Sequence, residues 1–156
     1  PGEWNPAGDF YLAPEIYYYQ APGETERGTS HLIRYGIPSG TTEDISKSLD
    51  VEDAEAVYSP DGSSIAFARK FLDEAHWTLG RQLWIMNADG SNAHQITNEA
   101  DFNHYDLAWS RDGQDLAYVQ FDDSKPFNPP ELWMINVDGS NANQLVIKGY
   151  SPIWIP

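Results

Sequence analysis

Short apolar segments alternate with turn-forming residues along most of the chain. The segments Ile65–Arg69 and Leu116–Gln120 are rich in apolar residues and are the length of a β-strand. Each of them follows an Asp-Gly pair, at Asp61-Gly62 and Asp112-Gly113. Asp-Gly supplies the positive φ that a tight two-residue hairpin needs, so each pair predicts a turn between antiparallel strands. The pattern therefore predicts a β protein.

The same pieces recur in the same order about every 50 residues. The strand at Ile65 corresponds to one at Ile16 and one at Leu116. The next strand of each copy, which is the third of its unit, begins at Leu32, Leu83 and Leu132. A short closing strand follows at 43–45, 94–97 and 143–145. Asp89-Gly90 and Asp138-Gly139 join the last two strands of their copies. Four antiparallel strands at this period are typical of a β-propeller blade.

Both ends of the chain carry pieces of the first strand of this unit. The segments "AVYSPDG" and "LAWSRDG" give that strand in two copies, and in the first copy either "FYLAPE" or "EWNPAG" corresponds to it. The final "GYSPIWIP" aligns with the start of a further copy and stops where Asp-Gly would follow. Aromatic residues recur at equivalent positions, so we expect them to pack between blades: Tyr58, Trp109 and Trp154 on the first strand, and Trp84 and Trp133 on the third.

The segments "YSPDGSSIAFAR", "QLWIMNADGSNAHQIT" and "ELWMINVDGSNANQL" resemble the repeats of TolB-type (WD-repeat-like) β-propellers. The resemblance covers residues from about 54 to 156. We therefore expect an all-β fold with three blades, at about residues 10–53, 54–105 and 106–149, and an extra terminal strand at 150–156. The resemblance implies a six-bladed ring, a role in protein contact rather than chemistry, and an extracytoplasmic setting, periplasmic or secreted.

Three blades do not close a ring, because closed propellers have 4–8 blades. Each end of a three-blade stack leaves an apolar flank that needs a neighbour. We expect two copies of the chain to complete a six-bladed ring, as a homodimer or within a higher assembly. A longer propeller from which these residues come, or a different partner chain, would cover the same flanks.

The net charge of −15 changes the picture of possible partners. A phosphate backbone or an anionic membrane surface would be repelled, so we expect no nucleic-acid partner. The chain has no cysteine and no apolar stretch of about 18 residues, so the sequence predicts neither disulfides nor a membrane span. The charge favours solubility, or attraction to cations and basic partners.

The connections that vary between copies are expected to share one face of the propeller, which we call the loop face. They are predicted at residues 21–31, 47–55, 70–81, 98–106 and 121–130. Recognition tends to reside in such loops. Acids and aromatics beside one another suit a basic or amine-bearing ligand, although a solvated acidic rim explains them equally well. The candidate ligand-binding residues are Asp73, Glu74, His76, Trp77, Asp101, Phe102, His104, Tyr105, Asp106, Asp122, Asp123 and Phe127.

The sequence offers no catalytic motif and no metal-binding motif. The turns "NADGSN" and "NVDGSN" lack the spacing of a calcium-binding EF-hand loop, although loop carboxylates leave Ca²⁺ as a possible ligand. His31, His76 and His104 are expected on the loop face, but no histidine pair has metal-ligand spacing. We therefore expect a non-catalytic binding module without a cofactor. Two alternatives remain: a subunit of an extracellular filament or surface array, and a metal-dependent propeller enzyme acting on carbohydrates or peptides.

Overall fold

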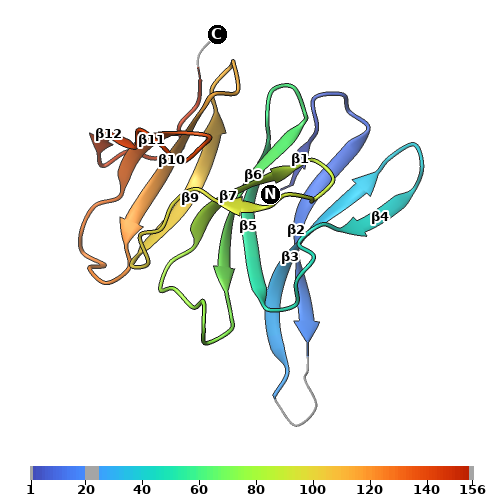
Figure 1. Ribbon diagram of the computed structural model, residues 1–156, viewed down its shortest axis with the longest axis horizontal. Coiled ribbons are helices and arrows are strands. Elements are labelled where there is room, and N and C mark those ends of the chain that lie inside the picture. The colour runs from blue at the N-terminus through green and yellow to red at the C-terminus, as the bar shows by residue number, and fades with distance from the viewer. Residues whose placement is uncertain (1, 20–24, 155–156) are drawn as a thin grey trace.

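The computed structural model describes residues 2–19 and 25–154 and contains three four-stranded antiparallel sheets, which stand side by side in Figure 1. Each sheet is one blade. Blade 1 consists of β1 (Glu3–Trp4), β2 (Phe10–Tyr19), β3 (Arg27–Gly36) and β4 (Thr41–Asp44). Blade 2 consists of β5 (Val51–Tyr58), β6 (Ser64–Phe71), β7 (Gln82–Asn87) and β8 (His94–Gln95). Blade 3 consists of β9 (Phe102–Trp109), β10 (Asp115–Asp122), β11 (Glu131–Asn136) and β12 (Asn143–Ile147). The expected all-β propeller fold is confirmed. None of the described residues forms a helix long and apolar enough to cross a membrane.

The glycines of the Asp-Gly pairs adopt the expected positive φ, with 73° at Gly62 and 77° at Gly90. The prediction of two-residue hairpins is wrong, however. Ser59 N–H donates to the Ser64 carbonyl at 2.9 Å, which leaves residues 60–63 in the loop. Asn87 N–H donates to the Ser91 carbonyl at 2.9 Å, which leaves residues 88–90 in the loop. A loop of three or four residues built on a type I turn needs one left-handed residue, and glycine provides it.

The first strand of blade 1 is formed by "EWNPAG". Strand β1 pairs with β2 through Glu3 with Leu12 and Trp4 with Tyr11. The alternative segment "FYLAPE" is the beginning of β2, so the second strand of blade 1 starts at Phe10 rather than Ile16. Strands β2 and β3 have ten residues each, and Figure 1 shows them extending beyond the ends of the other strands.

Two segments that the sequence predicts as loops contain strands. Residues 47–55 include the start of β5, and residues 98–106 include the start of β9. Their polar residues Asp53 and His104 are both 0% exposed. Alternation of apolar and polar residues therefore does not reveal these strands, because the buried positions hold polar side chains with internal partners.

The core lies between the blades, in two layers. Leu12 and Leu32 of blade 1 pack with Phe67 and Met86 of blade 2 in the first layer. The second layer joins blades 2 and 3 and includes Leu83, Leu116, Tyr118 and Ile135. Of the recurring aromatics, Tyr58 is buried in the first layer and Trp84 packs against it, while Trp109 and Trp133 pack against the second. These four aromatics serve as the expected packing residues between blades.

Residues 151–154 follow blade 3 and occupy the place where the first strand of a fourth blade would begin. The Trp154 indole Nε1 donates to the Ala108 carbonyl at 3.2 Å, just as Trp109 Nε1 donates to the Val57 carbonyl at 3.1 Å. Ser151 N–H donates to an Asp106 carboxylate oxygen at 2.9 Å. Trp154 remains 44% exposed, so the expected packing between blades is incomplete at this position. The prediction of a terminal strand at 150–156 is wrong for its described part, because residues 150–154 form no strand. Residues 155–156 lie outside the described residues.

Candidate functional site

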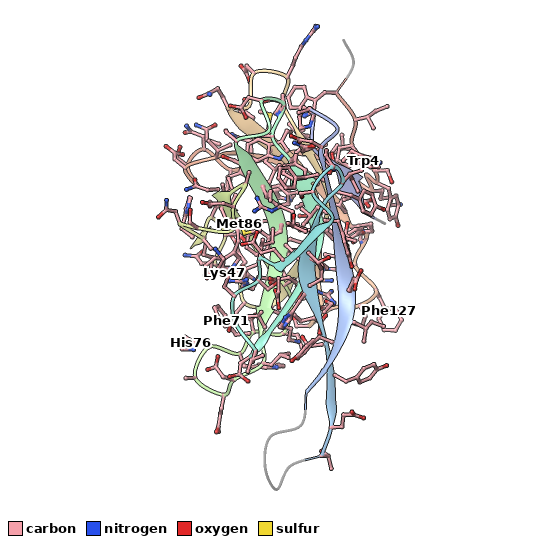
Figure 2. All side chains as sticks on the ribbon, turned by 90° about the vertical axis from the view of Figure 1, so that its right-hand side faces the viewer. Trp4, Lys47, Phe71, His76, Met86 and Phe127 are labelled. Atoms are coloured by element: carbon pink, nitrogen blue, oxygen red, sulfur yellow. The ribbon has the colours of Figure 1, made fainter. Side chains whose placement is uncertain are left out.

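The connections β6–β7 and β10–β11 project from the loop face. In Figure 2, Phe71, His76 and Phe127 lie toward one end of the molecule and Trp4 lies toward the other, where the turns between first and second strands are found. Residues 21–24 of the loop expected at 21–31 lie outside the described residues. The predicted binding residues divide into three groups.

The first group lies in the β6–β7 loop and is held together by Asp73. Its carboxylate accepts the Ala75 and His76 backbone N–H groups, each at 3.1 Å, and pairs with His76 Nδ1 at 2.8 Å. Burial acts to raise the pKa of Asp73, but the hydrogen bonds and the nearby charge of His76 outweigh it, and the pKa is lowered. Lys70 Nζ lies 4.7 Å from the Trp77 ring centroid, and Trp77 is 53% exposed. Glu74 is exposed beside them.

The second group lies at the end of β10 and in the loop that follows. Asp122 is buried and accepts Ser124 N–H at 3.0 Å and Lys125 Nζ at 2.7 Å, which lowers its pKa. Burial raises the pKa of the neighbouring Asp123. Phe127 is 100% exposed and is available to a partner, whereas Asp122 is a structural residue of the loop.

The third group belongs to strand β9 and its approach rather than to a loop, which corrects its predicted placement. Asp101 is exposed, Phe102, Tyr105 and Asp106 are half-buried, and His104 is 0% exposed. His104 Nδ1 lies 2.6 Å from the Arg81 carbonyl and must donate to it, so Nδ1 carries the proton. Burial lowers the pKa of His104, although the Arg81 carbonyl and Glu99 act against this. A surface ligand does not reach this imidazole, and it serves as a packing residue.

The three histidines expected on the loop face do not converge there. His31 is 1% exposed, and its Nδ1 bonds the Asp44 carboxylate at 2.7 Å. His104 is equally buried, and His76 alone of the three is exposed. Within residues 2–19 and 25–154, no group of three or more His, Cys, Asp or Glu side chains is arranged to hold a metal ion. The described residues therefore contain no cluster of this kind for the Ca²⁺ that the sequence suggested as a possible ligand.

Sequence reasoning missed a buried ion pair between Asp53 and Arg69. Arg69 Nε and Nη2 donate to the two Asp53 carboxylate oxygens, both at 2.7 Å, and Ser46 Oγ donates to one of them at 2.6 Å. The pair faces across β5 and β6, where Asp53 is the register partner of Arg69. His104 and Gln120 are register partners in the corresponding strands of blade 3. The two pairs are separated by about 50 residues, which is the length of the repeat. This correspondence was the sequence signal that could have revealed the paired positions.

Two cavities of the structure lie away from the predicted binding residues, with the exception of Asp106. One of about 510 Å³ opens between blades 2 and 3 at the turn end and is lined by Trp109, Arg111 and the turn carboxylates of Asp61 and Asp112. Hydrogen bonds from Ser59 and Ser63 lower the pKa of Asp61 to about 2, so the Asp61 carboxylate stays ionised. Another cavity, of about 300 Å³, lies along the inner strands and is lined by Glu3, Glu55 and Asp106, among others. The loop-face residues thus form separate surface groups.

Blades of four antiparallel strands with cores between them define this chain as part of a β-propeller. No family model matches it. A curated relative, dipeptidyl-peptidase 5 of Porphyromonas gingivalis, is 36% identical over 66 residues, which cover 42% of this chain and 10% of that protein.

Solved structures agree with the propeller assignment. A protein assigned as TolB from Agrobacterium tumefaciens matches with a TM-score of 0.66 and 20% identity, over 92% of this chain and 48% of that one. A chain of a nidogen/laminin complex matches with a TM-score of 0.64 and 14% identity, over 94% of this chain and 47% of that one. The chain thus spans about half the length of these propeller chains, and the likeness shows the fold.

Proposed function

We propose that this chain is a non-catalytic binding and assembly module that contributes three blades to a six-bladed propeller. The observation that carries the proposal is the pair of open flanks. On and beside the blade 3 flank, Leu145 is 49% exposed, Val146 is 51% exposed and Ile153 is 81% exposed. In blade 1, Tyr17 of β2 is 42% exposed and lies on the strand face opposite Leu12, which packs against blade 2. Apolar surface at the two ends of a stack of blades favours association with further blades.

Two copies of the chain supply the number of blades that the similar propellers suggest, since three blades cover about half of those chains. Residues 151–154 of one copy would meet blade 1 of the other and extend it toward a ring. The nidogen/laminin complex supports a role in protein contact, because a propeller of similar fold is seen there in a protein complex. The resemblance to TolB repeats supports an extracytoplasmic setting.

Size-exclusion chromatography with light scattering tests the assembly at micromolar concentration. We expect a mass of twice the 17.6 kDa of one chain. Negative-stain electron microscopy then separates a closed ring from an open array, in which the flanks of many copies pair in a filament. A stable monomer at micromolar concentration would contradict self-assembly, and an open array would favour a structural subunit instead.

A further inference from the structure

The cavity of about 510 Å³ between blades 2 and 3 takes no part in the proposed assembly. All of its lining residues lie between Ser59 and Asp138. The four strands of each of these two blades are within the described residues, and the blades stand side by side in Figure 1. The shape of the cavity therefore depends on neither flank of the stack. Its volume is within the range of about 300–1,000 Å³ that is typical of small-molecule sites.

The floor of this cavity is apolar, because the cavity reaches the second core layer. Ile85 is a buried member of that layer, and Trp109 and Val137 pack against it. The Trp109 indole is held in place by the hydrogen bond from its Nε1 to the Val57 carbonyl at 3.1 Å. A ligand would thus meet a fixed aromatic ring beside two aliphatic side chains, and a preformed surface of this kind favours binding.

Three turn carboxylates line the same cavity. They belong to Asp61 and Asp112, in the turns between first and second strands, and to Asp138, in the turn between β11 and β12. Each accepts the backbone N–H of the residue two positions further on, at 3.0 Å, 3.2 Å and 2.9 Å respectively. Hydrogen bonds from serine hydroxyls and from these N–H groups lower the pKa of all three carboxyls, so they are ionised at neutral pH.

The cavity carries an excess of negative charge that a cation would balance. Among the described residues that line it, Arg111 is the only Lys or Arg, and it is exposed. The arginine ion pairs of the described residues involve Arg34, Arg69 and Arg81 instead. With His94 neutral, three carboxylates face one guanidinium, so the negative charge is not compensated beside the apolar floor. This charge attracts a cationic ligand and repels an anionic one.

We propose that this cavity binds a primary ammonium group on an apolar stem, with the stem against the Trp109 ring and the ammonium among the three turn carboxylates. The carboxylates come from three separate turns, which suits a compact ammonium with three donors better than a planar guanidinium that pairs with one carboxylate. The indole adds cation–π attraction. A free amine and the lysine side chain of a partner protein share this chemistry. The inference rests on the proposed binding role and specifies its ligand, but it does not require the ring.

Small probes with one stem and different charges test this ligand class. Phenethylammonium combines a phenylethyl stem with a primary ammonium group. The alcohol 2-phenylethanol carries the same stem without a charge, and 3-phenylpropanoate carries it with a negative charge. Nα-acetyl-lysine amide presents the ammonium group as a protein partner would. Titrations followed by ¹H–¹⁵N NMR measure binding, and the Nε1–H signal of Trp109, assigned by its loss in Trp109→Phe, reports on the cavity itself.

Two matched variants test the carboxylates. Asp138→Asn and Asp89→Asn each remove one negative charge from a turn between third and fourth strands, and Asp138 is the one that lines the cavity. Both aspartates accept a backbone N–H at 2.9 Å, from Ser140 and Ser91, and asparagine keeps an acceptor for it. Arg111→Gln removes the competing cation. The dispersion of the NMR spectrum verifies that each variant is folded.

We expect phenethylammonium to bind with a millimolar dissociation constant, and 2-phenylethanol to bind at least about fivefold more weakly. Asp138→Asn should weaken binding of the amine by at least about threefold, whereas Asp89→Asn should not, because only the first lies at the cavity. Arg111→Gln should strengthen it by about twofold. Equal effects of the two aspartate variants would overturn the inference, as would tighter binding of 3-phenylpropanoate or no saturable binding of the amine up to about 20 mM.

The lysine probe separates the two sources of the ammonium group. If Nα-acetyl-lysine amide binds as tightly as phenethylammonium, the site suits the side chain of a protein partner; if phenethylammonium alone binds, the site suits a free amine. Light scattering on the same samples keeps this inference apart from the proposed assembly. A monomer that binds the amine supports the site and contradicts the ring, whereas a dimer that binds no amine contradicts only the site.

Discussion

Asp53 and Arg69 join the first two strands of blade 2 through a bidentate ion pair that water does not reach. Asp53 is 0% exposed and Arg69 is 7% exposed. The guanidinium carbon of Arg69 also lies 5.0 Å and 5.3 Å from the ring centroids of Phe67 and Trp84. Removing the carboxylate would leave a buried cation between aromatic rings without a counter-charge, which is far costlier than the loss of a surface pair.

Asp53→Ala is therefore expected to lower the free energy of unfolding by about 3–5 kcal/mol, measured by urea denaturation. The control is Glu43→Gln, since Glu43 is largely exposed and pairs with Arg34 at 2.6 Å. Loss of a surface pair should change the free energy by no more than about 1 kcal/mol. Similar losses in the two variants would show that burial does not strengthen the Asp53 pair.

His104 gives the junction of blades 2 and 3 a dependence on pH. Its Nε2 is buried without a hydrogen-bond partner, and a carboxylate oxygen of Glu99 lies 4.0 Å away. Burial lowers the pKa of His104 in the folded chain, so folding favours the neutral imidazole. Protonation then favours the unfolded chain, and stability is lost as pH falls below the ordinary histidine pKa of about 6.5.

We predict that the wild-type chain loses more stability between pH 7.5 and pH 5.5 than the His104→Asn variant does. Asparagine keeps a donor for the Arg81 carbonyl but does not titrate, so it removes only the protonation step. Urea denaturation at both pH values measures the difference. Parallel pH dependence in the two proteins would show that Glu99 compensates for the burial of the imidazole.

At the scale of elements, the β7–β8 hairpin of blade 2 depends on glycine more than the β9–β10 hairpin of blade 3 does. Gly90 has a φ of 77°, and a Cβ at this position would lie 2.9 Å from both Cβ and the carbonyl oxygen of Ile45 in blade 1. Gly113 has a similar φ of 71°, but the nearest atom to its Cβ would be Pro60 Cδ at 3.8 Å. The two positions share backbone strain and differ in the space available.

Gly113→Ala should cost about 1–2 kcal/mol of stability, which is the penalty of a left-handed conformation for an L-residue. Gly90→Ala should cost more, because the new methyl group also forces blades 1 and 2 apart. Thermal denaturation of the two variants measures the difference. Equal melting temperatures would mean that the junction of these blades yields without cost.

The first strand of each blade was predicted less completely from the sequence than the second and third strands. The second and third strands and the Asp-Gly turns were predicted, because apolar runs and turn residues recur every 50 residues or so. Strands β5 and β9 were not predicted in full, because their inward positions hold Asp53 and His104. Asp53 is buried with Arg69 as its partner, and His104 with the Arg81 carbonyl. Both partners are distant in the sequence from the residues that they stabilise.

The same limit applies to the candidate site. Exposed residues such as Trp77 and Phe127 were placed on the loop face correctly, since variable loops lie at the surface. His104 was expected in a loop, because its burial depends on the Arg81 carbonyl, which is distant in the sequence.

At the scale of the whole molecule, two opposing forces act on association. The apolar flanks of blades 1 and 3 favour contact with further blades. The net charge of −15 repels a second copy of the chain, and this repulsion extends over the Debye length. The Debye length is about 30 Å at 10 mM salt and about 8 Å at 150 mM, so salt weakens the repulsion while leaving the apolar contact intact.

Self-association should therefore strengthen with salt, by at least about tenfold in the dimer dissociation constant between these two concentrations. Analytical ultracentrifugation measures it. Ile153→Lys places a charge on the 81% exposed residue beside the blade 3 flank and should weaken association at both salt concentrations. Phe127→Lys adds the same charge on the loop face, where it lowers the net repulsion without touching a flank, and should not weaken association. Association that weakens with salt, or that responds equally to the two substitutions, would place the contact on charged surface rather than on the apolar flanks.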